Sequence, residues 1–139
     1  MNYLLDTCAI SELAAKRPNQ KIANWIDSIE EARLHLSVIT IGEIRKGIEK
    51  LPDSPRRKAL EEWLNEQLLV RFAGRIIPID TGVMLTWGQL TGALETTGKT
   101  MSAISSLIAA SALHGSFSLV TRNEGDFKDA GVAVVNPWR

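Results

Sequence analysis

Three carboxylates in this 139-residue sequence lie where they could share a cation. Asp6 directly follows a short apolar run, Glu43 comes about one helical turn after a second run, and Asp126 follows a third. Clustered carboxylates repel one another unless a cation neutralises them. Oxygen donors without His or Cys suit Mg²⁺ or Mn²⁺, which can activate a water for attack on a phosphate ester. The pattern therefore predicts a magnesium or manganese site that acts on phosphates.

Each acid also has an ordinary structural explanation. Asp6 could be the N-cap of a helix, and Asp126 could be a solvated turn residue. Glu43 has capping-box spacing with Thr40. A phospho-acceptor domain of flavodoxin-like type would need an acidic pair near the first strand and a lysine after a late strand. Asp6 stands alone there, and Arg122 takes the place of the lysine, so this class is disfavoured.

The elements that must position these acids follow from the apolar pattern. Segments in which apolar residues recur with helical spacing alternate with short apolar, β-branched runs. This alternation indicates an α/β fold with a mostly parallel sheet and helices on both faces. Five strands are predicted, at 3–5, 34–39, 75–79, 117–121 and 132–135. Helices are predicted at 7–15, 22–29, 40–51, 56–72, 83–98 and 104–113.

Parallel strands bring their carboxyl ends to one edge of the sheet, where binding sites form. Asp6 follows the first strand, Glu43 the second, and Asp126 the fourth. Arg122 and Asn123 also follow the fourth strand directly. We therefore expect these five side chains to meet at one edge.

Composition sets the class of protein. Sixteen Lys and Arg balance sixteen Asp and Glu, so the net charge of zero argues against coating nucleic acid over the whole surface but leaves a local site open. The length predicts a single domain over residues 1–139. The lone Cys8, the lack of an apolar run long enough for a membrane helix, and an N-terminus unlike a signal peptide predict a soluble cytoplasmic protein without a membrane partner.

Motifs along most of the chain resemble those of PIN domains, and within them the VapC toxins of bacterial and archaeal toxin–antitoxin pairs. They lie, in order, at Tyr3–Thr7 with Ser11–Leu13, Ser37–Ile44 with Gly47–Ile48, Ser106–Ala112, Leu119–Phe127 and Val135–Trp138. No single motif is decisive, but their order and spacing together are specific.

The resemblance implies a three-layer α/β/α sandwich and an endoribonuclease that depends on Mg²⁺ or Mn²⁺ to cleave RNA. It also implies a cognate antitoxin and a homodimer. The metal-binding acids of the family map onto Asp6, Glu43 and Asp126, with Thr7 and Asn123 as polar neighbours of the site.

Ser105 departs from the family pattern, which has an acid at this position. A hydroxyl is a weaker ligand than a carboxylate, so the site loses one negative charge and affinity for a divalent ion. Three readings stay open: a natural variant that still binds one metal, a degenerate copy, and an engineered substitution. They lead to two functions, a weakened ribonuclease toxin and an inactive PIN-fold module that binds an antitoxin or RNA without cleavage.

Basic and apolar features near the acids allow two further hypotheses. The segment Arg45–Lys58 is rich in basic residues. It is either a solvated surface or a row of basic side chains that begins beside Glu43 and contacts nucleic-acid phosphates. Arg122 would either contact RNA phosphate or form an ion pair with Asp126. The apolar stripes at 22–29 and 60–64 predict a groove for an antitoxin helix.

Overall fold

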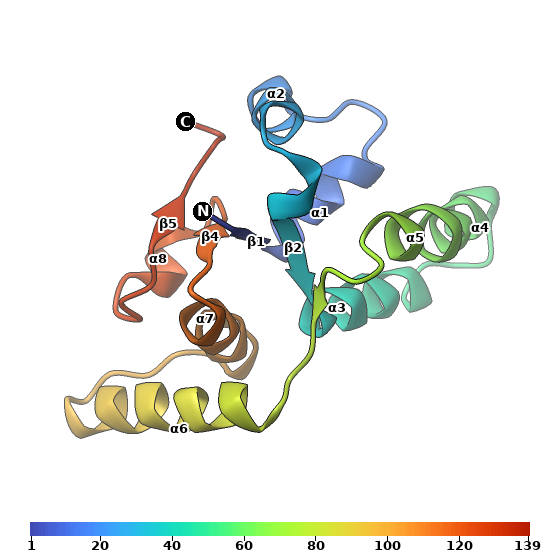
Figure 1. Cartoon of the computed structure of the whole chain (residues 1–139). Helices are drawn as coiled ribbons and strands as arrows, with labels where there is room; N and C mark the ends of the chain where they lie inside the picture. Colours follow the sequence, from blue (N-terminus) through green and yellow to red (C-terminus); the bar gives the residue numbers. More distant parts are fainter.

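The computed structural model describes residues 1–139 and contains one five-stranded sheet with the strand order β3-β2-β1-β4-β5 (Figure 1). All four strand pairings are parallel, which confirms the predicted α/β class and makes the sheet wholly rather than mostly parallel. The strands are β1 Tyr3–Leu5, β2 Leu34–Ser37, β3 Ile76–Ile77, β4 Ser118–Val120 and β5 Val134–Val135. β1 lies at the centre, so Asp6 leaves the sheet between β2 and β4.

Helices connect the strands and form the outer layers. No helix is both long enough and apolar enough to cross a bilayer. The elements are α1 Thr7–Ala14, α2 Gln20–Ser28, the 3₁₀ turn η1 Glu31–Arg33, α3 Val38–Glu49, α4 Pro55–Glu62, the π-helical stretch η2 Trp63–Leu68, α5 Leu69–Arg71, α6 Thr81–Thr96, α7 Ala103–Gly115 and α8 Glu124–Phe127.

Alternate residues of β1 define the two faces of the sheet. Leu5 packs into a cluster with apolar residues of α1, α2, α3 and η2, whereas Leu4 packs with residues of α7 and α8. Both leucines are essentially inaccessible, and burying each contributes about 1.5–3 kcal/mol. The two clusters make the structure a three-layer α/β/α sandwich, as the resemblance implied.

Polar N-cap residues begin most of the helices. Asp6, Asn19, Ser37, Asp80 and Ser102 each accept a hydrogen bond from a backbone N–H of the helix that follows. Because these donors have no partner within the helix, each such cap stabilises its helix by about 1 kcal/mol. The caps at Asp6 and Ser37 fix where α1 and α3 leave the sheet.

The start of α3 corrects one prediction. The apolar run 34–39 is not strand throughout, because Ser37 accepts a hydrogen bond from Ile39 N–H and the helix begins at Val38. The capping box between Thr40 and Glu43 is therefore wrong, since both residues lie inside α3. Glu43 loses its ordinary structural explanation.

The remaining differences concern the lengths of elements and two short elements, η1 and α8, that the sequence analysis did not predict. The predicted strands at 75–79, 117–121 and 132–135 shorten to β3, β4 and β5, and the helix predicted for 56–72 begins at Pro55 and becomes π-helical at Trp63. The shortening at 117–121 matters for the site, because Thr121 falls outside β4.

Phe72 should be among the most costly residues to truncate. Its side chain is fully buried in the cluster beneath α1 and α2, and the guanidinium of Arg75 lies 4.8 Å from its ring centroid. We expect Phe72→Ala to lower the free energy of unfolding by about 3–5 kcal/mol in urea titrations. Val70, two residues away and 67% exposed, provides the control: Val70→Ala should change that free energy by no more than about 0.5 kcal/mol.

Candidate active site

Asp6 is held at the junction between β1 and α1 by both of its carboxylate oxygens. Oδ1 accepts a hydrogen bond from Thr7 N–H (2.8 Å), and Oδ2 accepts one from the Thr121 hydroxyl (2.8 Å). The backbone N–H of Asp6 donates to the carbonyl of Val120 (3.0 Å), and the residue is only 7% exposed. The carboxylate is thus buried in one orientation beneath the edge of the sheet.

Thr121 is a site residue that the sequence analysis missed. It directly follows β4 and is fully buried, and its hydroxyl accepts a hydrogen bond from Asn123 N–H (3.0 Å) while donating to Asp6. Its backbone N–H donates to the carbonyl of Val135 (3.1 Å). The rule that polar residues follow strands would have identified Thr121 had the predicted strand ended one residue earlier.

Glu43 is joined to Asp6 through the intervening Thr7. The Thr7 hydroxyl donates to Glu43 Oε1 (2.5 Å) and lies 3.1 Å from the Thr40 hydroxyl. Since Thr7 has one hydroxyl proton and uses it on Glu43, Thr40 is the donor to Thr7. Thr40, which is fully buried one helical turn before Glu43, is a second positioning residue that the sequence analysis did not assign to the site.

Burial and neighbouring negative charges affect the ionisation of the Asp6 carboxyl. Burial, the largest cause, raises the pKa of its carboxyl above the usual value. The hydrogen bonds from Thr121 and Thr7 oppose the rise, whereas the negative charges of Glu43 and Asp126 add to it. The negative charges of both Glu43 and Asp126 therefore act on the Asp6 carboxyl.

The donor chemistry of these acids fits a hard divalent cation, since every donor is an oxygen and the negative charges are mutually unfavourable. The acids do not form a complete metal-binding site by themselves, because no group of three His, Cys, Asp or Glu side chains is placed to hold a metal ion. Asp126 is the outlying member, exposed on α8. Thr7 holds Asp6 and Glu43 by hydrogen bonds, whereas the Asp126 side chain forms no hydrogen bond or ion pair within the protein.

Ser105 and Asp126 line the same cavity of about 400 Å³. Ser105 lies in the first turn of α7, and its N–H donates to the N-cap hydroxyl of Ser102 (3.2 Å). Its own hydroxyl has no hydrogen-bond partner in the protein. Lys128 and Asp129 complete the polar wall of this cavity on the side of α8. Ser105, which the resemblance expects to be an acid, thus lines one cavity with Asp126.

The two basic candidates, Arg122 and Arg45, have different surroundings in the structure. The guanidinium of Arg122 lies 5.7 Å from the ring centroid of Trp138, and it forms no ion pair with Asp126, so phosphate contact is the remaining hypothesis for Arg122. The guanidinium of Arg45 forms ion pairs with two neighbouring surface acids, Glu49 at 2.6 Å and Glu61 at 4.0 Å. Ion pairing within that surface gives Arg45 a structural role.

Cys8 lies against the site without taking part in it. Its thiol is 3.9 Å from Asp6 Oδ2 and 3.6 Å from the Thr121 hydroxyl. Burial raises the pKa of this thiol, so it stays protonated at neutral pH and is a poor nucleophile.

Known proteins show which family shares this arrangement. The family model described as PIN domain matches residues 3–133. The chain belongs to the PIN domain family. Toxin FitB of Neisseria gonorrhoeae is 39% identical over 135 residues, which cover 97% of each chain. The VapC ribonuclease Y4jK of Sinorhizobium fredii is 34% identical over 135 residues, covering 97% of this PIN domain and 96% of that protein.

The fold agrees with a solved structure as well. The crystal structure of FitAcB from Neisseria gonorrhoeae superposes with a TM-score of 0.92 at 39% identity, covering 99% of this PIN domain and 99% of that chain. The PIN fold thus extends over 99% of the chain. Asp6 and Glu43 fall within the motifs on which the resemblance rested, and Ser105 lies immediately before the third motif.

Removing the charge of Asp6 should stabilise the metal-free PIN domain at neutral pH. The pKa of this carboxyl is raised in the folded state, so the contribution of Asp6 to stability is greatest below the unfolded value of 3.8 and is lost as the pH rises through the folded value. We expect Asp6→Asn, which keeps the N-cap oxygen, to unfold at a higher urea concentration than wild type at pH 7 in EDTA. The difference should shrink as the pH approaches 4; a difference independent of pH would contradict this account.

Proposed function

We propose that this protein is the toxin of a toxin–antitoxin pair and acts as a metal-dependent endoribonuclease. The observation that carries the proposal is the linked pair Asp6 and Glu43, joined by Thr7 at the edge of the sheet with the charge of Asp126 nearby. The names of the relatives, toxin FitB and a VapC ribonuclease, support the same activity, since both match this chain nearly end to end.

In this proposal Asp6, Glu43 and Asp126 hold Mg²⁺ or Mn²⁺. When bound, the ion would lower the pKa of a water and stabilise negative charge on the scissile phosphate, and hydrolysis would leave 5′-phosphate and 3′-hydroxyl ends. The hydroxyls of Thr121 and Thr7 orient the Asp6 and Glu43 carboxylates before RNA binds. This preorganisation matters because a ligand fixed in advance costs no rearrangement during the reaction.

Arg122 and Asn123 would support the substrate rather than the metal. Both are exposed beside the site, directly after Thr121. Arg122, stacked on Trp138 and free of carboxylate partners, is available for an RNA phosphate. Asn123 is fixed through its backbone N–H and leaves its amide side chain free.

An apolar groove that reaches the site offers a place for the antitoxin. The predicted groove between the 22–29 and 60–64 stripes is wrong, because Ile22 and Ile26 are buried in the core. A cavity of about 380 Å³ lies instead between α1, α3 and the α4–η2 segment, and its lining includes Leu60, Trp63 and Glu43. A partner helix seated there would cover the Glu43 side of the site. The homodimer and the single-domain organisation over 1–139 remain part of this proposal.

Ser105 favours a second candidate, an inactive PIN module that binds its antitoxin or RNA without cleavage. With a hydroxyl at this position, the cavity shared with Asp126 has one carboxylate fewer than the family pattern provides. Cleavage assays decide between the two candidates.

Asp6→Asn should abolish most metal-dependent RNA cleavage. The substitution keeps the side-chain shape but removes a charge that holds the ion, and losing several kcal/mol of transition-state stabilisation lowers the rate about 100-fold or more. The measurement is cleavage of a panel of structured RNAs in Mn²⁺. The exposed Asp27 of α2 gives the matched control, Asp27→Asn. Equal cleavage by wild type and Asp6→Asn would reject the metal role of Asp6.

Restoring the acid with Ser105→Asp should increase cleavage about tenfold or more if the protein is a weakened nuclease. The new carboxylate would adjoin Asp126, and an acid in the first turn of α7 is compatible with the helix dipole. Ser105→Asn provides a control of equal size without charge. Cleavage that does not rise above that of Ser105→Asn would favour the inactive module.

A further inference from the structure

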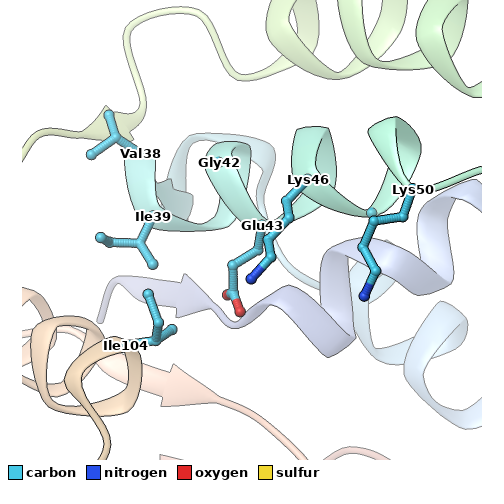
Figure 2. Close-up of a pocket in the computed structure, with 8 residues that line it drawn as sticks. Val38, Ile39, Gly42, Glu43, Lys46, Lys50 and Ile104 are labelled. Carbon is cyan, nitrogen blue, oxygen red and sulfur yellow. The ribbon is translucent and has the colours of Figure 1, made fainter.

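A second cavity extends from the candidate site along the outer face of α3. It has a volume of about 440 Å³, and its lining includes Glu43, Lys46 and Lys50. Figure 2 shows these three side chains leaving α3 toward the same side, with Ile39 at the start of the helix and Ile104 facing it from α7. The cavity therefore connects an acid of the site to two ammonium groups and an apolar end.

The two lysines differ from the other bases of the Arg45–Lys58 segment that lie near α3. Arg45 and Arg57 are neutralised, since Arg45 pairs with Glu49 at 2.6 Å and Arg57 with Glu61 at 3.0 Å. Lys46 and Lys50 are exposed, and neither forms an ion pair in the structure. Both ammonium groups line the cavity, and neither is paired with a carboxylate. About 6 Å of helix rise separates them.

Glycines keep this face of α3 open. A Cβ at Gly42 or Gly47 would meet no protein atom within 4 Å, so the space beside them is not used for packing within the chain. Glycine inside a helix costs roughly 0.5–1 kcal/mol relative to alanine. Two such residues on the cavity wall leave room for a ligand backbone to approach α3.

The far end of the cavity is apolar. Val38 and Ile104 are 38% and 42% exposed, although both are large apolar residues, and Ile39 lies between them in the lining. A flat apolar group such as a nucleobase can cover such a surface. Phosphates suit the other end, where the charge is positive.

We propose that this cavity is a subsite for single-stranded RNA beside the cleavage site. Lys46 and Lys50 bind successive backbone phosphates, and the surface of Ile39 and Ile104 holds a base. The inference rests on the proposed ribonuclease function and deepens it, since it names the residues that guide the strand to Glu43. Lys46 and Lys50 are positioning residues, and they take no part in the chemical step.

Charge favours RNA over a second copy of the chain as the occupant. A two-fold interface centred on Lys46 and Lys50 would set the lysines of one copy against those of its partner, and like charges brought together are unfavourable. A polyanion instead gains from both ammonium groups and releases counterions.

Binding measured without divalent metal tests the subsite separately from cleavage. The probe is a fluorescein-labelled unstructured 20-nucleotide RNA, titrated in EDTA at several KCl concentrations with fluorescence anisotropy as readout. Lys46→Ala and Lys50→Ala should each weaken binding several-fold and reduce the slope of log K against log salt by about 0.7. Lys21→Ala, which removes an exposed lysine of α2, should leave affinity and slope unchanged.

Three results would overturn the inference: no binding of the probe by wild type, equal affinity of the Lys46→Ala/Lys50→Ala double variant and Lys21→Ala, or a change in the monomer–dimer equilibrium of the double variant without a change in salt slope. The third result would assign the face to an interface between copies. Wild type that binds the probe through the lysines but does not cleave RNA in Mn²⁺ would support the subsite and reject the proposed nuclease activity.

Discussion

The burial of one carboxylate, that of Asp6, organises this end of the molecule. A charged group with 7% exposure is tolerated only when its oxygens are satisfied, and here the N–H of Thr7 and the hydroxyl of Thr121 satisfy them. The first bond starts α1 and the second ties β1 to the segment after β4. Asp6 thus also has a structural role, because it links β1 to a segment more than a hundred residues away in sequence.

Helix α3 carries the other half of the site. Because Ser37 starts the helix at Val38, Thr40 and Glu43 share the face that meets Thr7, and the chain of hydroxyls from Thr40 through Thr7 ends on the Glu43 carboxylate. The next turns of the same face carry Lys46 and Lys50. One helix therefore presents an acid for the metal and, a turn farther on, two unpaired bases for RNA, and its starting residue sets the alignment of both.

A net charge of zero conceals this segregation. Acids gather where parallel strands end, and a bound cation would relieve their mutual repulsion. Arg45 and Arg57 beside α3 form local ion pairs, such as that of Arg57 with Glu61, whereas the two lysines of the cavity form none. The partners that such a surface recognises depend on where unpaired charge remains, and total charge does not reveal this.

The sequence by itself determined the α/β class, the order of the strands along the chain, and the placement of Asp6 after the first strand. Apolar runs and helical stripes are local patterns, and the carboxyl ends of parallel strands must share an edge. It also exposed the departure at Ser105, through motifs that are local in sequence. Tertiary structure alone decided the roles of Thr121 and Thr40, because a hydroxyl becomes part of a site only when a distant carboxylate is buried against it. The same holds for Lys46 and Lys50: sequence shows six bases between Arg45 and Lys58, but which of them are neutralised depends on how α3 and α4 pack. The boundary at Ser37 was mispredicted since β-branched residues suit both a strand and the first turn of a helix, and the cap hydrogen bond chooses between them.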